Sequence, residues 1–209
     1  MTTSERAPGL RLGDGVALPE DLELGAQVTI HADVDIGAGC SLQDGAVIGE
    51  PGGAGVRIGD GVAVCARARL AAAAVVGPDT IVGDQAVLEA GAAVGSDVLV
   101  GRGATVGARA VVGDRARLQT NVVLEEAAAL DEDVFVGPGA WVGRDAVLRR
   151  ACRVGAAAKI AAGAKIGEEA FVGAGAHVAR DVAPRAVMVG RPARRIRDVA
   201  DGDLIERWR

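Results

Sequence analysis

The chain has 209 residues, of which half are hydrophobic, and its net charge is −5; it contains two Phe, two Trp and no Tyr. This acidic balance excludes a basic field for nucleic acid, and so few rings leave no platform on which bases could stack. No apolar run approaches the roughly 18 residues of a membrane span, and residues 1–10 lack the apolar centre of a signal peptide. We therefore expect a cytoplasmic protein that neither binds nucleic acid nor inserts into a membrane.

The first part of the chain carries an aliphatic residue at every sixth position, and these residues are Leu12, Leu18, Leu24, Ile30, Ile36, Leu42 and Ile48. Residues 1–10 precede this pattern and are predicted to be an N-terminal extension. Between Ile48 and Ile58 the spacing is ten, and the additional residues fall in a Gly- and Pro-rich stretch, residues 50–55. This composition predicts a loop extruded at a corner, either as a tolerated insertion or as part of a substrate site.

From Ile58 to Ala183 the six-residue pattern continues without interruption. All twenty-one positions in this phase are aliphatic: Ile58, Val64, Leu70, Val76, Val82, Leu88, Val94, Val100, Val106, Val112, Leu118, Leu124, Leu130, Val136, Val142, Leu148, Val154, Ile160, Ile166, Val172 and Val178. Four residues after each stands a small side chain, mostly Ala, otherwise Val, Thr or Cys. The residue directly after the aliphatic one is often Gly, as at Gly77 and Gly101, which suits a tight corner.

A period of six fits neither the 3.6-residue repeat of an α-helix nor the two-residue alternation of a long strand. It predicts short strands joined by corners, with the aliphatic residue pointing inward and the small residue filling a crowded part of the interior. Three sides close a coil of 18 residues, so residues 18 apart lie above one another at the strand spacing of ~4.8 Å. We predict an all-β parallel β-helix over residues 11–183, with about nine coils and a length of roughly 45 Å.

The tail comprises residues 184–209 and begins at Pro184, where the repeat ends. Residues 198–209 predict a short C-terminal helix, which would cover the exposed strand edge of the last coil.

The three cysteines occupy positions of the repeat: Cys40 and Cys152 stand at inward small positions and Cys65 follows an aliphatic residue. We expect small buried hydrophobes rather than disulfides or metal ligands.

Two further stretches are more specific than the repeat itself. Residues 118–122 (LQTNV) are followed by residues 131–138 (DEDVFVGP), and Gly190-Arg191-Pro192-Ala193-Arg194 comes after the last coil. Together with the repeat they resemble the hexapeptide-repeat acyltransferases, and the pattern is most similar to nucleotide-sugar N-acetyltransferases. The resemblance covers nearly the whole chain. It implies a single-stranded, left-handed β-helix and a homotrimer with parallel axes.

The resemblance also implies a reaction, the direct transfer of an acetyl group from acetyl-CoA, a co-substrate, to a small acceptor such as a sugar nucleotide. It places Asn121, with Gln119 beside it, at the acceptor site. An uncharged amide can orient an amine or hold a developing oxyanion, so the residue type agrees with this role. Asn also tolerates the left-handed backbone of a corner, and this structural role remains an alternative for Asn121.

A general base can be sought among the His and Glu residues. His31 and His177 lie about five and three coils from Asn121, or ~24 and ~15 Å, which is too far within one chain. Two His do not supply the three ligands of a histidine zinc site, and we expect no metal. Glu125 lies one side further round from Asn121, and a Glu whose pKa is raised by burial can act as a base. Alternatively, Glu125 is a solvent-exposed charged residue at a corner, without a catalytic role.

The same 18-residue interval stacks Trp141, Lys159 and His177 in successive coils above the level of Asn121. In the family that the chain resembles, pantetheine runs along a groove between subunits towards the C-terminal coils. The resemblance therefore assigns acetyl-CoA binding to Trp141, Lys159, His177, Gly190, Pro192, Ala193 and Arg194, with the cation of Arg194 or of Arg195 near the phosphates. The alternative is that Lys159 and His177 are ordinary exposed residues and that Trp141 packs in a subunit interface.

The chain departs from the family pattern after Gly137-Pro138. Related enzymes commonly carry a polar loop there that helps to bind the acceptor, whereas here the repeat continues directly. A second hypothesis therefore stands beside the N- or O-acyltransferase: a catalytically silent β-helix that serves as a scaffold or binding protein and derives from such an enzyme.

Overall fold

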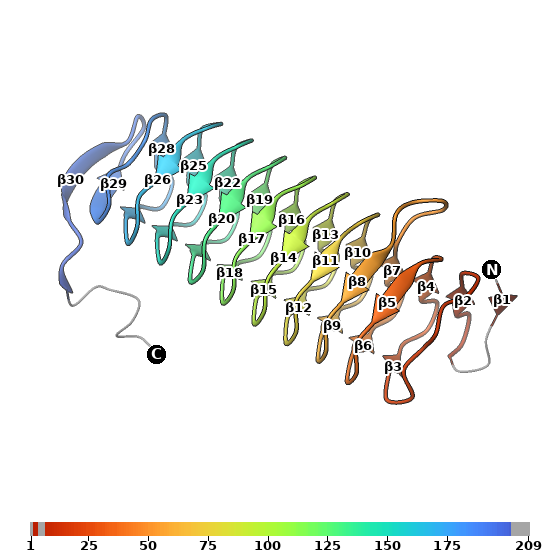
Figure 1. The fold of residues 1–209 in the computed structure, drawn as a ribbon. Helices are drawn as coiled ribbons and strands as arrows, with labels where there is room; N and C mark the ends of the chain where they lie inside the picture. Colours follow the sequence, from red (N-terminus) through yellow and green to blue (C-terminus); the bar gives the residue numbers. More distant parts are fainter. Residues whose placement is uncertain (1, 4–6, 202–209) are drawn as a thin grey trace.

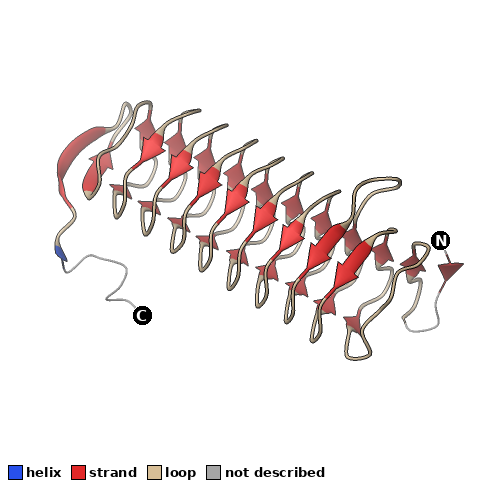
Figure 2. Ribbon diagram, in the orientation of Figure 1, coloured by secondary structure: helices blue, strands red, loops and turns tan. Residues whose placement is uncertain are grey.

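The computed structural model describes residues 2–3 and 7–201, which form an all-β parallel solenoid, as predicted (Figures 1 and 2). Its strands line up in three sheets, one for each side of the prism. Sheet A contains β1 (Thr2–Thr3), β2 (Arg11–Leu12), β4 (Thr29–Ile30), β7 (Val47–Ile48), β10 (Arg69–Leu70), β13 (Val87–Leu88), β16 (Thr105–Val106), β19 (Val123–Leu124), β22 (Trp141–Val142), β25 (Lys159–Ile160) and β28 (His177–Val178).

Sheet B contains β3 (Glu23–Leu24), β6 (Ser41–Leu42), β9 (Ala63–Val64), β12 (Ile81–Val82), β15 (Leu99–Val100), β18 (Arg117–Leu118), β21 (Phe135–Val136), β24 (Arg153–Val154), β27 (Phe171–Val172), β29 (Ala186–Val189) and β30 (Arg194–Asp198). Sheet C contains β5 (Val34–Ile36), β8 (Val56–Ile58), β11 (Val75–Val76), β14 (Ala93–Val94), β17 (Val111–Val112), β20 (Ala129–Leu130), β23 (Val147–Leu148) and β26 (Lys165–Ile166).

The register of the sheets follows the 18-residue coil. Trp141 pairs with Lys159 and Lys159 with His177, each 18 residues further along the chain. Between β5 and β8 the interval is 22 residues, since Val34 pairs with Val56. The additional residues lie in the connection between β7 and β8, which protrudes from the prism (Figure 1).

The interior is built from the two predicted columns of side chains. From Val64 to Val178 every aliphatic residue of the six-residue phase is at most 3% exposed, and the small residues four positions later are buried as well. Thr80 is the one buried polar side chain among the described residues. Its hydroxyl donates to Gly95 O at 2.8 Å and accepts from Val98 N at 3.1 Å, so its burial leaves no unpaired group.

The corners differ from the prediction. The left-handed backbone lies three residues after the inward aliphatic residue, as at Gln85 (φ 57°) and Arg115 (φ 58°), and not at the Gly that directly follows it. That Gly serves another purpose. A Cβ added at Gly77 or Gly101 would lie 2.6 Å from a backbone carbon of the next coil, so these glycines let successive corners stack closely.

Both ends of the described prism carry an antiparallel strand. β1 pairs with β2 at one end, and β29 and β30 form an antiparallel pair at the other. The predicted C-terminal helix falls largely on residues 202–209, which lie outside the described part of the chain, and Asp198 still belongs to β30. β29 pairs with β27 in parallel and with β30 antiparallel, so β30 covers the free edge of β29. No helix within the described residues is long and apolar enough to cross a membrane.

Candidate functional site

The candidate site lies along one edge of the prism, where the chain passes from sheet B to sheet A. The corner residues of four successive coils form this B/A edge: Asn121, Gly139, Ala157 and Gly175. Backbone hydrogen bonds connect the corners, from Gly139 N to Thr120 O at 2.9 Å and from Gly175 N to Ala156 O at 2.7 Å. The structure therefore brings the four residues into one column, as the coil arithmetic predicts.

Asn121 stands at the lower end of this column and is exposed. Its φ of 56° is left-handed, so it does occupy the corner conformation that its residue type tolerates. Its carboxamide lies over Gly103, because an ideal Cβ at that glycine would be 2.4 Å from Asn121 Oδ1. Gln119, in the same corner, is half-buried. Two uncharged amides thus belong to the same corner, and each has an NH₂ group that can donate to a carbonyl oxygen.

Glu125 lies at a different corner, between sheets A and C, so β19 separates it from Asn121. Its Oε2 accepts a hydrogen bond from Arg144 N at 2.9 Å in the next coil. Glu89 makes the same contact with Ala108 N at 2.9 Å two coils lower. The recurrence shows that these carboxylates satisfy corner amides, which favours the structural alternative for Glu125 over the role of general base.

A ladder of outward side chains on sheet A runs beside the B/A edge. Trp141, Lys159 and His177 follow one another in register on β22, β25 and β28. Trp141 is half-buried, whereas Lys159 and His177 are exposed. An aromatic surface at the level next to Asn121 is thus followed by two polar, cation-forming side chains in the direction of the C-terminus.

The tail continues this ladder. His177 N donates to Gly190 O at 2.9 Å, and Ala193 N donates to His177 O at 2.8 Å, so residues 190–193 lie directly against β28. Arg191 Nε donates to Gly175 O at 2.6 Å and covers the upper end of the B/A edge. Arg194 is exposed and lines a cavity of about 400 Å³. The other lining residues are Val178, Ala179, Arg180, Asp181, Met188, Pro192 and Ala193.

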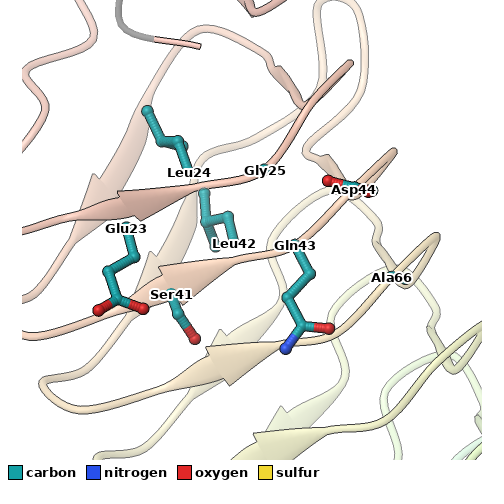
Figure 3. Close-up of a pocket in the computed structure, with 8 residues that line it drawn as sticks. All are labelled: Glu23, Leu24, Gly25, Ser41, Leu42, Gln43, Asp44 and Ala66. Carbon is teal, nitrogen blue, oxygen red and sulfur yellow. The ribbon is translucent and has the colours of Figure 1, made fainter. Parts of the chain in front are cut away.

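A second cavity, of about 410 Å³, lies on sheet B in the first coils (Figure 3). The side chains of Glu23, Ser41 and Gln43 point to the same side of the sheet there. Asp44 Oδ1 accepts from Ala26 N at 2.8 Å and is part of a corner. The cavity is separated from the level of Asn121 by four strand spacings, ~19 Å, and contains none of the predicted site residues.

Sequence reasoning missed a ladder on the other side of the B/A edge. The outward residues of β18, β21, β24 and β27 are Arg117, Phe135, Arg153 and Phe171, which pair in register. The guanidinium carbon of Arg153 lies 5.4 Å from the centre of the Phe171 ring. This ladder could have been predicted from the sequence, because its residues are separated by the same 18-residue interval that aligns Trp141 with Lys159.

The described part of the chain contains no group of three or more His, Cys, Asp or Glu side chains placed to hold a metal ion. The three cysteines are free: Cys40 and Cys152 are buried and Cys65 is half-buried. Burial raises the pKa of the Cys152 thiol far above its ordinary value, and the charge of Asp131 raises it further. Cys152 therefore stays protonated inside the prism.

The chain matches no protein-family model and no curated protein sequence, but solved structures share its fold. LpxA, a UDP-N-acetylglucosamine acyltransferase from Bacteroides fragilis, is similar with a TM-score of 0.76 and 16% identity, over 88% of this chain and 75% of that one. For the UDP-N-acetylglucosamine acyltransferase of Francisella novicida the values are 0.59 and 13%, over 98% and 72%. At such identities the likeness shows the fold alone, which is a parallel β-solenoid.

Proposed function

We propose that this protein transfers an acyl group, acetyl in the first instance, from acyl-CoA directly to the amine or hydroxyl of a small acceptor such as a sugar nucleotide. The observation that carries the proposal is the continuous B/A edge. The corner at Asn121 carries an amide, and Trp141, Lys159 and His177 follow it in successive coils. The tail residues 190–193 then contact His177. The acyltransferase fold supports the same reaction class.

In this proposal the thioester of the co-substrate lies between Asn121 and Trp141, and its pantetheine arm follows the sheet A ladder upward. Lys159 and His177 flank the arm, and the cation of Arg194 meets the phosphates. The backbone of residues 190–193 is itself engaged with His177, so Gly190, Pro192 and Ala193 act by placing Arg194 at the end of the track. Trp141 supplies an apolar wall for the acyl end.

Asn121 is the residue to which we assign transition-state stabilisation. Its amide nitrogen donates to the thioester oxygen as this oxygen becomes an oxyanion, which needs no charged side chain. The unprotonated acceptor nitrogen adds to the acyl carbon, and the carbonyl electron pair moves to the oxygen. The carbonyl re-forms as the carbon–sulfur bond breaks, CoA leaves as the thiolate, and the proton of the nitrogen passes to solvent. Gln119 orients the acceptor, because it is the neighbouring amide in the same corner.

The assembly in this proposal is a homotrimer with parallel axes. The two cavities described above are open and lined in part by exposed charged residues, whereas grooves between packed prisms would enclose a ligand. Free cysteines agree with a cytoplasmic location. Light scattering at micromolar concentration should give the mass of three chains; a monomer would contradict the trimer.

Calorimetry of CoA binding tests the track. Lys159→Ala and Arg194→Ala should each weaken CoA binding, whereas Lys165→Ala, an exposed Lys on sheet C at a similar height, should leave it unchanged. Unchanged affinity in both track variants, with the assembly intact, would contradict the placement of the co-substrate.

The scaffold hypothesis also has a specific observation in its favour. Residues 137–142 form an ordinary corner, in which Gly139 N bonds to Thr120 O as in the neighbouring coils, and no acceptor loop protrudes. A wild-type protein that binds neither CoA nor acetyl-CoA would favour the scaffold. Release of CoA in the presence of amino sugars or their nucleotides would exclude it.

A further inference from the structure

The outward column of sheet C is apolar in its middle and charged at both ends. Its strands follow one another from β5 to β26 (Figure 1). From β11 to β23 the column consists of aliphatic residues in which Val alternates with Ala: Val75, Ala93, Val111, Ala129 and Val147. Val75 is 40% and Val111 49% exposed. Asp35 and Arg57 precede this apolar strip on β5 and β8, and Lys165 follows it on β26.

The charged residues at the two ends of the strip are exposed. Asp35 and Arg57 are neighbours on adjacent strands, yet within the described residues neither they nor Lys165 form a salt bridge through their side chains. A cavity of about 350 Å³ lies beside Asp35 and is also lined by Asp33 and by Gly55 of the protruding connection. Two carboxylates at an open cavity suit an ammonium group that comes from outside the chain.

We propose that sheet C is a self-association surface, on which a second copy of this chain packs face to face with its prism axis reversed. A two-fold axis between the levels of Ala93 and Val111 gives this arrangement, and the contact is then isologous. Facing sheets pack about 10 Å apart. Large side chains then face small ones, because Val111 meets Ala93 of the second copy and Val75 meets Ala129.

The charged ends are complementary in the same arrangement. Lys165 of the second copy faces Asp35 and enters the cavity that Asp33 and Asp35 line. The two-fold axis repeats this contact at the other end of the strip. Arg57 faces Val147 of the second copy, and the methylene groups of its side chain can lie against that valine. One symmetry axis therefore satisfies the apolar strip and both of its ends.

Other face-to-face arrangements fit less well. With parallel axes and a two-fold along the prism, each residue would face its own copy, so that Asp35 would oppose Asp35 and Lys165 would oppose Lys165. Like charges in such positions disfavour a complex. If the reversed copy is shifted by one strand, Lys165 either faces Arg57 or lies beyond β5. The order of residues in the column therefore selects the reversed arrangement and its register.

The size of the face predicts a weak contact. Eight strands at ~4.8 Å and a width of about three residues give roughly 400 Å² on each copy, or about 800 Å² in total. Stable complexes bury about 1,200–2,000 Å². Sheet C also lies opposite the B/A edge of the triangular prism, so it does not compete with the acyl-CoA track. Self-association should therefore occur well above micromolar concentration and independently of the proposed reaction.

Analytical ultracentrifugation of the full chain from micromolar to millimolar concentration tests the surface. The mean mass of the wild type should rise with concentration. Val111→Glu should weaken this association at least tenfold, because it places a charge against Ala93 of the second copy. Ile81→Glu is the matched control, since Ile81 is a 45% exposed outward residue of sheet B, and it should associate as the wild type does. Thermal melting and the mass at micromolar concentration verify that each variant is folded and assembled.

A charge exchange tests the reversed arrangement itself. Asp35→Lys and Lys165→Glu each place like charges opposite one another and should weaken association, whereas the double variant pairs opposite charges again and should recover it. A wild-type mass that stays constant up to millimolar concentration would overturn the proposal, as would a folded Val111→Glu variant that associates like the wild type. Association of the double variant that is no stronger than that of the single variants would overturn the reversed register and with it the proposed contact.

Discussion

Sheet C and the B/A edge enclose the same kind of interior but present different outward surfaces. In five successive coils the outward residues of sheet C are small aliphatic ones: Val75, Ala93, Val111, Ala129 and Val147. At the upper B/A edge the outward residues are aromatic or cationic, as at Phe135 and Lys159. Since the inward columns are alike on all sides, the fold does not require this difference. Chemistry is therefore carried by outward positions, and the inward ones carry stability.

The largest expected effect comes from breaking the inward column. Leu124→Ala removes a fully buried side chain and leaves a cavity, so the free energy of unfolding should fall by about 2–5 kcal/mol. Val111→Ala on the outward face of sheet C, where Val111 is 49% exposed, should cost less than about 0.5 kcal/mol. Urea denaturation of both variants measures the contrast, and equal losses would contradict the division into inward and outward positions.

Substitution of Asn121 distinguishes a structural role at the corner from a role in acyl transfer. Asn121→Gly keeps a left-handed corner accessible and removes the amide, so acyl transfer should fall by about 10²–10³-fold with stability little changed. Gln85→Gly, two coils lower in the same column and also left-handed at φ 57°, should leave the rate unaffected. Equal rates for wild type and Asn121→Gly would reduce Asn121 to a corner residue.

The next prediction compares an inward Ala with an outward Ala, each replaced by Leu. Ala110→Leu adds volume where no space exists, and overpacking should destabilise the fold by about 1–3 kcal/mol. Ala129→Leu makes the same chemical change at a partly exposed outward position of sheet C and should cost less. Thermal or chemical denaturation compares the two, and a larger loss for Ala129→Leu would show that sheet C is covered.

The smallest effect concerns the pH dependence of stability. Burial raises the pKa of the Cys152 thiol above its ordinary value of about 9. Below pH 9 the folded and unfolded chains both keep the proton, whereas above it only the unfolded chain loses it. The contribution of Cys152 to stability should therefore decline above pH 9, by roughly 1 kcal/mol per pH unit. Denaturation curves of wild type and Cys152→Ala from pH 8 to 10.5 should diverge; parallel curves would contradict the inference.

Much of the fold could be predicted from the sequence because one interval determines both burial and stacking. This interval predicts the inward aliphatic column and the break before Ile58. It also predicts that Trp141 and Lys159 are neighbours on adjacent strands. The left-handed corner conformation could be foreseen at Asn121 from its residue type, but not at Gln85 or Arg115, whose residue types rarely adopt it. At these two corners a backbone hydrogen bond to the preceding coil, from Gln85 N to Ala66 O and from Arg115 N to Ser96 O, supports the conformation and does not depend on residue type.

The site was less accessible to sequence reasoning. The contact of Glu125 with Arg144 N depends on the geometry of one corner, and no spacing reveals it. The β29–β30 pair was not predicted, because the pairing of a strand with the edge of the last coil is a tertiary effect. The alignment of Arg117, Phe135, Arg153 and Phe171 on sheet B, by contrast, follows from the same 18-residue interval and could have been predicted.

Thermal unfolding of the wild-type protein with CoA and with acetyl-CoA tests the central claim most directly. A ligand at a hundred times its Kd stabilises the folded state by about 2.7 kcal/mol, so millimolar acetyl-CoA should raise the melting temperature by several degrees. Lys159→Ala should reduce this shift and Lys165→Ala should not. No shift for the wild-type protein with either compound at millimolar concentration would contradict an acyl-CoA site at the B/A edge.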